Sequence, residues 1–370
     1  MNAAFSKGKV DKGFLLICAA LVVVGFFIFS SASLGVLVSN ENKFSSVAFN
    51  QLLFGFFFGT IACWIFSKID YAVWRKYSFF IFIFSIILTL LVFVPHIGFE
   101  HGGAKRWIDI GITTFQPSEL LKVGFIMYLA AWISKIKDKI KTFQEGLLPF
   151  LVMVGVVGAV LLAQPDTDTY LVILLAGVAM YLAGGGKWSH MGLVALIGLV
   201  CIATLAYTRP YIKQRITTFI NPTENVLTSG YQIRQSLIAV GSGGLWGRGF
   251  GKSIQKFNYL PEPIGDSIFA VAAEEFGFIG STLILLIFIL FGMRGLKIAQ
   301  QSKDSFGGLL TLGIVILIMA QMFVNVGGMI GILPLTGIPL PFVSHGGTAL
   351  FITLVEVGII LNVSSKMKKI

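Results

Sequence analysis

Charged residues are scarce in this sequence: Asp, Glu, Lys and Arg make up only 12% of its 370 residues, whereas 56% are hydrophobic. The mean hydropathy is correspondingly high, at +0.86. Apolar runs of about 20 residues, the length needed to cross the hydrocarbon core of a bilayer, recur along the chain. Such runs are too long and too apolar for the alternating strands of a membrane barrel. The composition therefore excludes a soluble domain and predicts an all-α polytopic membrane protein.

Cysteine and histidine are also rare. The cysteines, Cys18, Cys63 and Cys201, fall inside apolar runs, where a thiol behaves as a small hydrophobic group. The histidines show none of the spacings that zinc ligands have; they are His96, His101, His190 and His345. We therefore expect no disulfide and no metal centre built from these residues.

The apolar runs predict about ten transmembrane helices, at residues 14–38, 47–67, 77–96, 116–134, 147–163, 169–185, 189–208, 266–293, 307–332 and 346–362. The first run is too long for a signal-peptide core and lacks a small-residue cleavage site nearby, so we expect it to stay in the protein. The chain is predicted to form a single transmembrane domain over residues 1–370. Its one long extracytoplasmic loop, residues 209–265, lies between the seventh and eighth helices.

Lysine and arginine concentrate in alternate connections between these helices. The connection at 135–141 holds four lysines, whereas the short loops on the other side hold only Lys43, Lys105 and Arg106. Cytoplasmic loops of membrane proteins carry an excess of basic residues. Both termini are therefore predicted to be cytoplasmic.

The predicted outer loop is basic despite its location. Two acidic residues, Glu224 and Glu262, accompany seven basic ones: Arg209, Lys213, Arg215, Arg234, Arg248, Lys252 and Lys256. Two interpretations stay open: attraction to anionic lipid headgroups, and a binding site for an anionic ligand at the membrane surface, such as a polyprenyl pyrophosphate. Nucleic acid is not expected as a partner, because the net charge of +11 mainly orients the chain in the membrane.

A glycine-rich run at 241–252 lies inside this loop. It neither follows a strand nor opens the helix of a βαβ unit, so a dinucleotide-binding fingerprint is excluded. Its backbone N–H groups can still turn toward a phosphate, with Arg248 and Lys252 adding charge; an interfacial loop without a ligand is the alternative. Just upstream, residues 231–240 predict a short helix at the membrane interface. This helix would offer polar side chains to sugar hydroxyls, namely Gln232, Gln235 and Ser236.

The fourth predicted helix begins with Gln116-Pro117-Ser118-Glu119. Proline suits the first helical position, where its missing N–H needs no partner. Glu119 then lies in the first turn, and Lys122 lies on the same face three residues later, so the two side chains can pair. A structural ion pair and the wall of a polar cleft are both open interpretations, since ionisable groups in spans face the protein interior.

Asp266 is an isolated carboxylate at the start of the eighth predicted helix. As an N-cap, aspartate would accept hydrogen bonds from helical N–H groups; as a functional group, it would need a water-accessible cleft at the membrane boundary. Asp166 and Asp168 form a D-x-D pattern at another predicted outer turn. That pattern is typical either of a divalent-cation site, because hard cations prefer carboxylate oxygens, or of an ordinary turn.

Short motifs follow one another along nearly the whole chain: 103–108, 116–119 with Lys122, 164–166, 230–232 with 235–236, 242–244, 260–262, 269–271 with 274–275, and 339–342 with Ser344 and 346–347. Together they resemble the SEDS family of bacterial shape, elongation, division and sporulation proteins. Details at 30–33, 69–71 and 255–263 resemble the division branch, FtsW, more than the elongation branch, RodA.

The resemblance implies a peptidoglycan glycosyltransferase that polymerises lipid II into glycan strands, during cell division or elongation, on the outer face of the bacterial cytoplasmic membrane. The implied partners are a class B penicillin-binding protein transpeptidase and other membrane proteins of the division or elongation complexes. The family's essential aspartate falls on Asp266. It would be the general base that takes the proton of the acceptor hydroxyl, while undecaprenyl pyrophosphate leaves with inversion. No cofactor is assigned, and a divalent cation, Mg or Mn, is the open candidate.

On the same resemblance, the substrate would be bound by Arg106, Gln116, Ser118, Glu119, Lys122, Arg234, Gln235, Ser236, Arg248, Lys252, Glu262, Ser344 and His345. Arg248, Lys252 or Arg234 would stabilise the charge of the departing pyrophosphate. The chain departs from the family's usual pattern at three places. It has Ile264-Gly265 in place of His-Thr, His345 in place of Tyr, and Asp168 in place of Gly.

Two other functions stay open. A lipid II flippase would use the same cleft for passage, but it would need polar groups in the cytoplasmic half of the bundle, where few are found beyond Gln321 and Asn325. A non-catalytic membrane scaffold that activates a partner synthase is the other alternative.

Overall fold

The computed structural model describes residues 9–39, 41–101, 104–109, 111, 114–221 and 229–367. Glu224 of the predicted outer loop and the first residue of the 103–108 motif lie outside the described residues. The elements are, in order, α1 (Lys12–Ser39), α2 (Glu41–Phe49), η1 (Asn50–Phe58), α3 (Gly59–Lys68), α4 (Tyr71–Leu90), η2 (Leu91–Phe93), β1 (Gly98–His101), β2 (Ala104–Asp109), β3 (Thr114–Phe115), α5 (Pro117–Ile136), η3 (Lys137–Lys141), η4 (Phe143–Leu147), α6 (Leu148–Ala163), α7 (Thr167–Ala183), α8 (Trp188–Thr208), α9 (Pro210–Ile220), α10 (Ser229–Ser242), α11 (Ile268–Gln300), α12 (Ser305–Met329) and α13 (Gly347–Ser364).

Eight helical segments among the described residues are long and apolar enough to cross a bilayer. They coincide with eight of the predicted spans. The other two predicted spans, 116–134 and 169–185, fall on α5 and α7; α5 is made more polar by Glu119 and Lys122, and α7 has only 17 residues. The prediction of a polytopic α-helical membrane protein is confirmed, and the number of ten spans stays a prediction.

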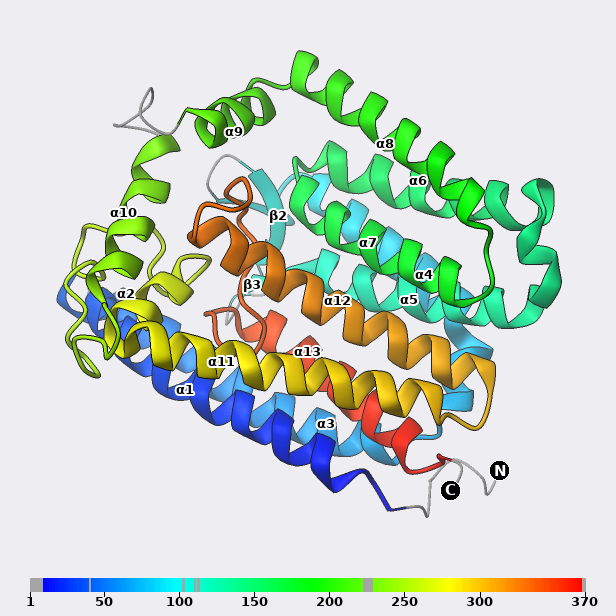
Figure 1. The fold of residues 1–370 in the computed structure, drawn as a ribbon, viewed down its shortest axis with the longest axis horizontal. Helices are drawn as coiled ribbons and strands as arrows, with labels where there is room; N and C mark the ends of the chain where they lie inside the picture. Colours follow the sequence, from blue (N-terminus) through cyan, green and yellow to red (C-terminus); the bar gives the residue numbers. More distant parts are fainter. Residues whose placement is uncertain are drawn as a thin grey trace.

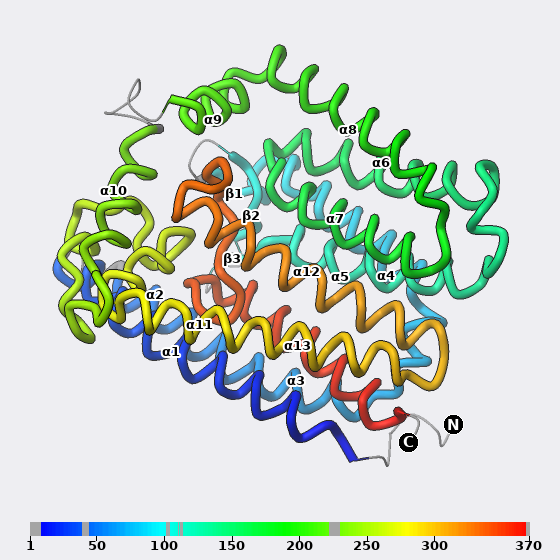
Figure 2. The backbone as a smooth tube through the Cα atoms, viewed as in Figure 1, coloured from blue at the N-terminus to red at the C-terminus, as the bar shows by residue number. Residues whose placement is uncertain are grey.

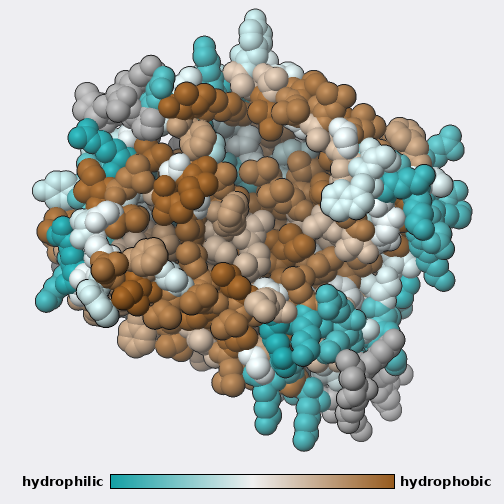
Figure 3. All heavy atoms as spheres, in the orientation of Figure 1, coloured by the Kyte–Doolittle hydropathy of each residue, from teal (hydrophilic) through white to brown (hydrophobic). Residues whose placement is uncertain are grey.

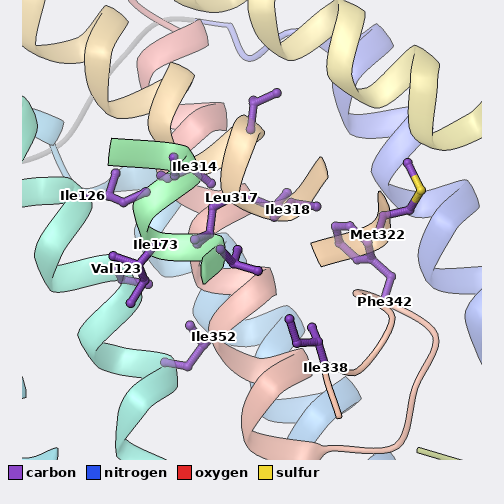
Figure 4. Packing of buried hydrophobic residues seen from close by; sticks show 14 of the residues in the cluster. Val123, Ile126, Ile173, Ile314, Leu317, Ile318, Met322, Ile338, Phe342 and Ile352 are labelled. Atoms are coloured by element: carbon purple, nitrogen blue, oxygen red, sulfur yellow. The ribbon is translucent and has the colours of Figure 1, made fainter. Parts of the chain in front are cut away.

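The long helices lie side by side, and α12 lies near the centre of the bundle (Figure 1). Figure 4 shows Val123 and Ile126 of α5, Ile173 of α7, Leu317 of α12 and Ile352 of α13 converging on one apolar cluster. Burial of such side chains fixes how the helices pack against one another. By contrast, α8 lies at the edge of the bundle (Figure 2) and buries none of its residues.

The surface separates into apolar and polar zones along the helix direction. Figure 3 shows apolar side chains across the middle of one face and polar side chains gathered toward its two ends. The start of α1 and the end of α13 meet at one end, where the Asp11 N–H donates to the Ser364 hydroxyl (3.0 Å). Arg294, near the end of α11, donates to both carboxylate oxygens of Asp11 (3.0 and 2.7 Å). Asp266 precedes α11 and therefore lies at the other end.

A small sheet interrupts the helical pattern between α4 and α5. Its order is β1-β2-β3, all antiparallel, with Gly98 opposite Ile108 and Ile108 opposite Phe115. The sequence prediction included no strands. Each strand has six residues or fewer, which is too short for an alternating pattern to stand out beside the long apolar runs.

The predicted outer loop contains two helices, α9 and α10. The short helix predicted at 231–240 is confirmed as the core of α10. The glycine-rich run that follows docks on α11: the N–H groups of Arg248 and Gly249 donate to the carbonyl oxygens of Glu274 and Glu275 (3.0 and 2.9 Å). These two N–H groups therefore hold the loop against a helix rather than facing a phosphate.

The helix α11 is interrupted at Gly277, and the glycine-rich loop binds to the helix backbone at this interruption. Its φ of 65° and ψ of −165° are not helical. The N–H groups of the next two residues, Phe278 and Ile279, leave the helix ladder and donate to the carbonyl oxygens of Gly244 and Leu245 (2.8 and 3.2 Å). Only glycine adopts this backbone region readily.

Replacing Gly277 with alanine is expected to lower the free energy of unfolding by about 2–4 kcal/mol, because the backbone region is strained for alanine and the new Cβ would lie 2.3 Å from the Gly247 nitrogen. Thermal unfolding of the purified protein in detergent measures the effect. Gly155→Ala on α6 is the matched control, since nothing lies within 4 Å of its added Cβ. Equal melting temperatures for the two variants would contradict the strain at Gly277.

Candidate active site

The carboxylate of Asp266 stands in a turn just before α11, whose first residue is Ile268. Its Oδ1 accepts hydrogen bonds from the side-chain amide of Gln232 on α10 (3.1 Å) and from the Ser267 hydroxyl (3.3 Å). Ser267 occupies the N-cap position, and its side chain makes no capping hydrogen bond. The N-cap interpretation of Asp266 is therefore wrong, because the helix begins two residues beyond it. The carboxylate is directed to α10 instead.

The backbone of this turn is held from two sides. The side-chain amide of Asn325 on α12 donates to the carbonyl oxygens of Asp266 (2.7 Å) and Ile338 (2.8 Å). The Ser344 hydroxyl donates to the carbonyl oxygen of Gly265, and the His345 N–H donates to that of Ile264 (both 2.7 Å). Three consecutive carbonyl groups are thus tied to other parts of the chain. This leaves little freedom for the backbone that carries the Asp266 side chain.

Asp266 lines a cavity of about 150 Å³, enough for a few water molecules. The cavity forms where α9, α10, the turn before α11 and the segment after α12 meet. Its lining consists of Arg215, Thr218, Phe219, Gln232, Ile233, Asp266, Leu335, Thr336 and Gly337. A carboxylate, a guanidinium, an amide and two hydroxyls therefore border one small space, together with three apolar side chains.

The environment of Asp266 changes its proton affinity. Burial is the largest cause that raises the pKa of Asp266 to about 7, because it removes water from the charged form. The hydrogen bond from Gln232 lowers this pKa, and the nearby Glu262 carboxylate raises it. A carboxyl group with a pKa near neutrality can both accept and release a proton at physiological pH.

Glu119 and Lys122 form the ion pair that their spacing predicts. Their carboxylate and ammonium groups lie 2.8 Å apart, and both side chains are buried. Glu119 also lines a separate, much smaller cavity of about 10 Å³, together with Gln321, Ser344 and Thr353 among others. The linings of the two cavities share no residue. Ser344 connects them indirectly, because it lines the Glu119 cavity and holds the Gly265 carbonyl beside Asp266.

The two aspartates of the D-x-D pattern are each paired with an arginine. The Asp166 Oδ1 lies 3.8 Å from the Nη1 of Arg106 on β2. The Nε and Nη2 of Arg106 donate to the carbonyl oxygens of Gln164 and Pro165. Asp168 lies 2.6 Å from the Nη1 of Arg215 on α9. Arg106 is therefore directed to the turn at 164–166. A metal ion bound at either carboxylate would share that carboxylate with an arginine.

The structure places the three basic residues predicted to hold a pyrophosphate outside the lining of the Asp266 cavity. Arg248 lies 3.4 Å from the Glu274 carboxylate. Arg234 on α10 and Lys252 in the following loop are exposed. The basic residue that does line this cavity is Arg215, which the sequence showed only as one of seven basic positions in the loop.

The remaining predicted site residues fall into different surroundings. Ser118 and Ser236 are buried, and the Ser236 hydroxyl donates to the Gln232 carbonyl oxygen (2.8 Å) within α10. Gln116 is the residue before α5, and Gln235 is half-buried on α10. Glu262 is exposed near Asp266. The His345 ring stacks on Phe29 at a centroid distance of 6.1 Å.

Comparison with known proteins places this arrangement in a family. The family model named for FtsW, RodA and SpoVE, described as "Cell cycle protein", matches residues 12–369. The chain belongs to this family. Residue patterns scattered over the whole chain had indicated the same membership, and the match spans nearly its full length.

Similar members of the family have been described in several bacteria. The chain is 44% identical over 313 residues to a probable peptidoglycan glycosyltransferase FtsW of Geobacter sp., covering 84% of each chain. It is 39% identical to the stage V sporulation protein E of Bacillus subtilis, covering 97% of this chain and 98% of that protein. A solved structure described as a peptidoglycan synthase complex that coordinates polymerization and crosslinking superposes with a TM-score of 0.78 at 25% identity, covering 96% and 97% of the two chains.

Two further residues of this family member contribute to the site without having been predicted there. Gln232 was expected to bind sugar hydroxyls, yet its amide is bonded to Asp266. Asn325 was considered only as a polar group for transport, yet it holds the Asp266 backbone. Gln232 shares α10 with Gln235, and Asn325 shares α12 with Gln321. The available signal was an amide inside an apolar span, as at Asn325, because a buried amide needs hydrogen-bond partners.

The described residues offer no group of three or more His, Cys, Asp and Glu side chains that could hold a metal ion. The two D-x-D carboxylates lie beside Arg106 and Arg215. Because Mg²⁺ is commonly held by only one or two carboxylates together with substrate phosphates and water, a bound Mg or Mn ion stays a prediction.

Proposed function

We propose that this protein is a peptidoglycan glycosyltransferase that polymerises lipid II, with Asp266 as the general base. The observation that carries the proposal is a carboxylate with a pKa raised to about 7, which lines a cavity and has its oxygen oriented by Gln232. Family relatives named as probable peptidoglycan glycosyltransferases support the reaction class. A general base works best when its pKa lies near the working pH.

In this mechanism, Asp266 accepts the proton of a sugar hydroxyl on the acceptor. The hydroxyl oxygen forms a bond to the anomeric carbon of the donor, and the bond from that carbon to the pyrophosphate oxygen breaks with inversion. The pyrophosphate leaves with the bonding electron pair, so negative charge gathers on it. Gln232 orients the carboxylate oxygen, and the hydrogen bonds to carbonyls 264–266 keep it in place. An oriented carboxylate on a fixed backbone supports this role, because catalysis requires positioning of the base.

The proposal also assigns an orientation in the bacterial cytoplasmic membrane. Both described ends of the chain lie at the end of the bundle that carries Arg294 and, by sequence, the basic connections; Asp266 lies at the other end. Basic loops favour the cytoplasmic side. This arrangement supports cytoplasmic termini and an active site on the outer face, where lipid II is polymerised.

A class B penicillin-binding protein is the proposed partner. The support is the overall likeness to the structure of a peptidoglycan synthase complex that combines polymerization with crosslinking. The two activities would act in sequence on one product, because the transpeptidase crosslinks the strands that the polymerase makes. Other membrane proteins of division or elongation complexes belong to the same proposal.

Purified full-length protein in vesicles, supplied with lipid II with and without a class B penicillin-binding protein, tests the proposal. We expect glycan polymer that disappears in the Asp266→Asn variant. The same vesicles, loaded with fluorescent lipid II, report translocation. Translocation without polymer would replace the proposal with the flippase alternative. Polymer that needs an added polymerase, and does not change with Asp266→Asn, would replace it with the scaffold alternative.

The polymerisation rate is expected to rise about tenfold per pH unit below pH 7 and to level off above it, because only the deprotonated carboxylate can act as the base and the pKa of Asp266 is raised to about 7. Initial rates between about pH 5 and about pH 9 measure this profile. Glu262→Gln removes a negative charge that raises this pKa, so its midpoint should move to lower pH. A profile that is flat or falls with rising pH would contradict the base assignment.

A further inference from the structure

Arg215 is the one basic side chain in the lining of the Asp266 cavity among the described residues. It projects from α9, whereas Asp266 and Gln232 border the cavity from the turn before α11 and from α10. The remaining lining is neutral. The cavity therefore places a fixed cation and a proton-accepting carboxylate in the same small space.

Asp168 fixes the position of this guanidinium. Its Oδ1 lies 2.6 Å from the Arg215 Nη1, and its Oδ2 accepts from the Gly337 N–H (3.1 Å). Asp168 is buried, while Arg215 keeps 32% of its side chain exposed. Because Gly337 also lines the cavity, a single carboxylate connects α7, α9 and the segment after α12. The guanidinium is held at the cavity wall by a charge-assisted bond.

The pairing leaves donors of Arg215 available. A guanidinium has five N–H donors in a planar fork, which suits phosphate oxygens. The contact with Asp168 uses Nη1, and the Tyr211 ring lies 6.0 Å from the guanidinium carbon. Within the part of the chain that the structure describes, the ion pair of Arg215 uses Nη1 alone, so Nε and Nη2 remain for an anion that enters the cavity.

We infer that Arg215 binds the phosphate oxygens of the polyprenyl pyrophosphate substrate inside the Asp266 cavity, and that Asp168 is the positioning residue that aims it. The inference rests on the proposed function, and it assigns the leaving-group contact to Arg215 rather than to Arg234, Arg248 or Lys252. A cation at this place stabilises the charge that gathers on the leaving pyrophosphate. In the displacement, the Asp266 carboxylate then accepts the proton of the attacking hydroxyl, and the Arg215 guanidinium stabilises the leaving pyrophosphate.

Binding can be measured apart from catalysis. The probes are a polyprenyl pyrophosphate and the polyprenol of the same chain length, added to the full-length protein in nanodiscs of neutral phosphatidylcholine. We expect the wild type to prefer the pyrophosphate, and Arg215→Gln to weaken pyrophosphate binding about 10- to 100-fold, as for the loss of a charged hydrogen bond. Polyprenol binding should not change. Lys213→Gln, which removes an exposed charge from the same helix, is the matched control and should behave as wild type.

The charge-swapped double variant Asp168→Arg/Arg215→Asp separates binding from a structural role. It rebuilds an ion pair between α7 and α9 but reverses the charge at the cavity wall. We expect the melting temperature to return toward that of wild type while the preference for pyrophosphate stays lost. Recovery of that preference in the swap, or unchanged pyrophosphate binding in Arg215→Gln, would overturn the inference.

Catalytic and membrane readouts complete the test. In neutral vesicles, Arg215→Gln should raise the KM for lipid II and lower kcat, while the midpoint of the pH profile stays that of Asp266. An effect of Arg215→Gln that appears only when phosphatidylglycerol is added would assign Arg215 to lipid headgroups and overturn the substrate contact. A wild type that binds the pyrophosphate through Arg215 but makes no polymer would refute the proposed function and leave the binding assignment standing.

Discussion

Asp266→Asn is expected to reduce the rate of lipid II polymerisation about 10²- to 10⁴-fold, the range that general-base catalysis contributes. Asparagine keeps the size of the side chain and can still meet Gln232, but its amide does not take up a proton. The hydrogen bonds from Asn325, Ser344 and His345 go to backbone carbonyls, so the turn should keep its conformation. The loss should therefore fall on kcat, with little change in the melting temperature.

Polymer length and yield from purified protein and lipid II measure this effect, with the class B partner present throughout. Asp109→Asn on β2 is the matched control, because it removes an exposed carboxylate outside the cavity lining. It should leave the rate unchanged. An Asp266→Asn variant that polymerises within about threefold of wild type would exclude the base mechanism, since a loss that small is below what general-base catalysis contributes.

Lys256→Met is expected to lower the free energy of unfolding by about 3–5 kcal/mol, the cost of leaving a buried charge without its partner. Lys256 and Glu275 are both buried, and their charged groups lie 2.7 Å apart. The Lys256 ammonium also donates to the Ser31 hydroxyl of α1 (3.0 Å) and to the Gly251 carbonyl oxygen (2.9 Å). The Lys256 ammonium therefore connects α1, the outer loop and α11. Methionine in its place would leave the Glu275 carboxylate buried without its positively charged partner.

Thermal unfolding in detergent, followed by circular dichroism, measures this loss. Lys252→Met is the matched control, because Lys252 lies in the same loop but is exposed, and we expect it to change stability by less than about 0.5 kcal/mol. The double variant Lys256→Met/Glu275→Leu removes both charges and should be more stable than Lys256→Met alone. If the double variant is the less stable of the two, the orphaned carboxylate is not the cause of the loss.

The helical spans were predictable because their signal is local. The bilayer thickness sets the length of an apolar run, and each run can be recognised without knowing its neighbours. The same holds for Pro117 at the first position of α5 and for the pair of Glu119 and Lys122 three residues apart, which depend only on the geometry of one helix. The helix at 231–240 belongs to the same class.

Predictions that depended on the exact start of a helix or on the path of a loop were less accurate. The α11 helix begins at Ile268, so Asp266 is not its cap. The loop places Arg248 3.4 Å from the Glu274 carboxylate and outside the lining of the Asp266 cavity, so its role as a pyrophosphate ligand stays a prediction. A sequence shows which charges a loop carries and does not show in which direction the loop turns.

By itself, the sequence determined that this protein is a polytopic helical membrane protein, and its ordered motifs indicated the family and the aspartate at the centre of the site. Only the tertiary structure decided which groups surround that aspartate. Gln232, Arg215 and Asn325 make their decisive contacts with residues 34, 47 and 59 positions away in the chain. Such contacts follow from how helices and loops pack in three dimensions, and no local periodicity records them.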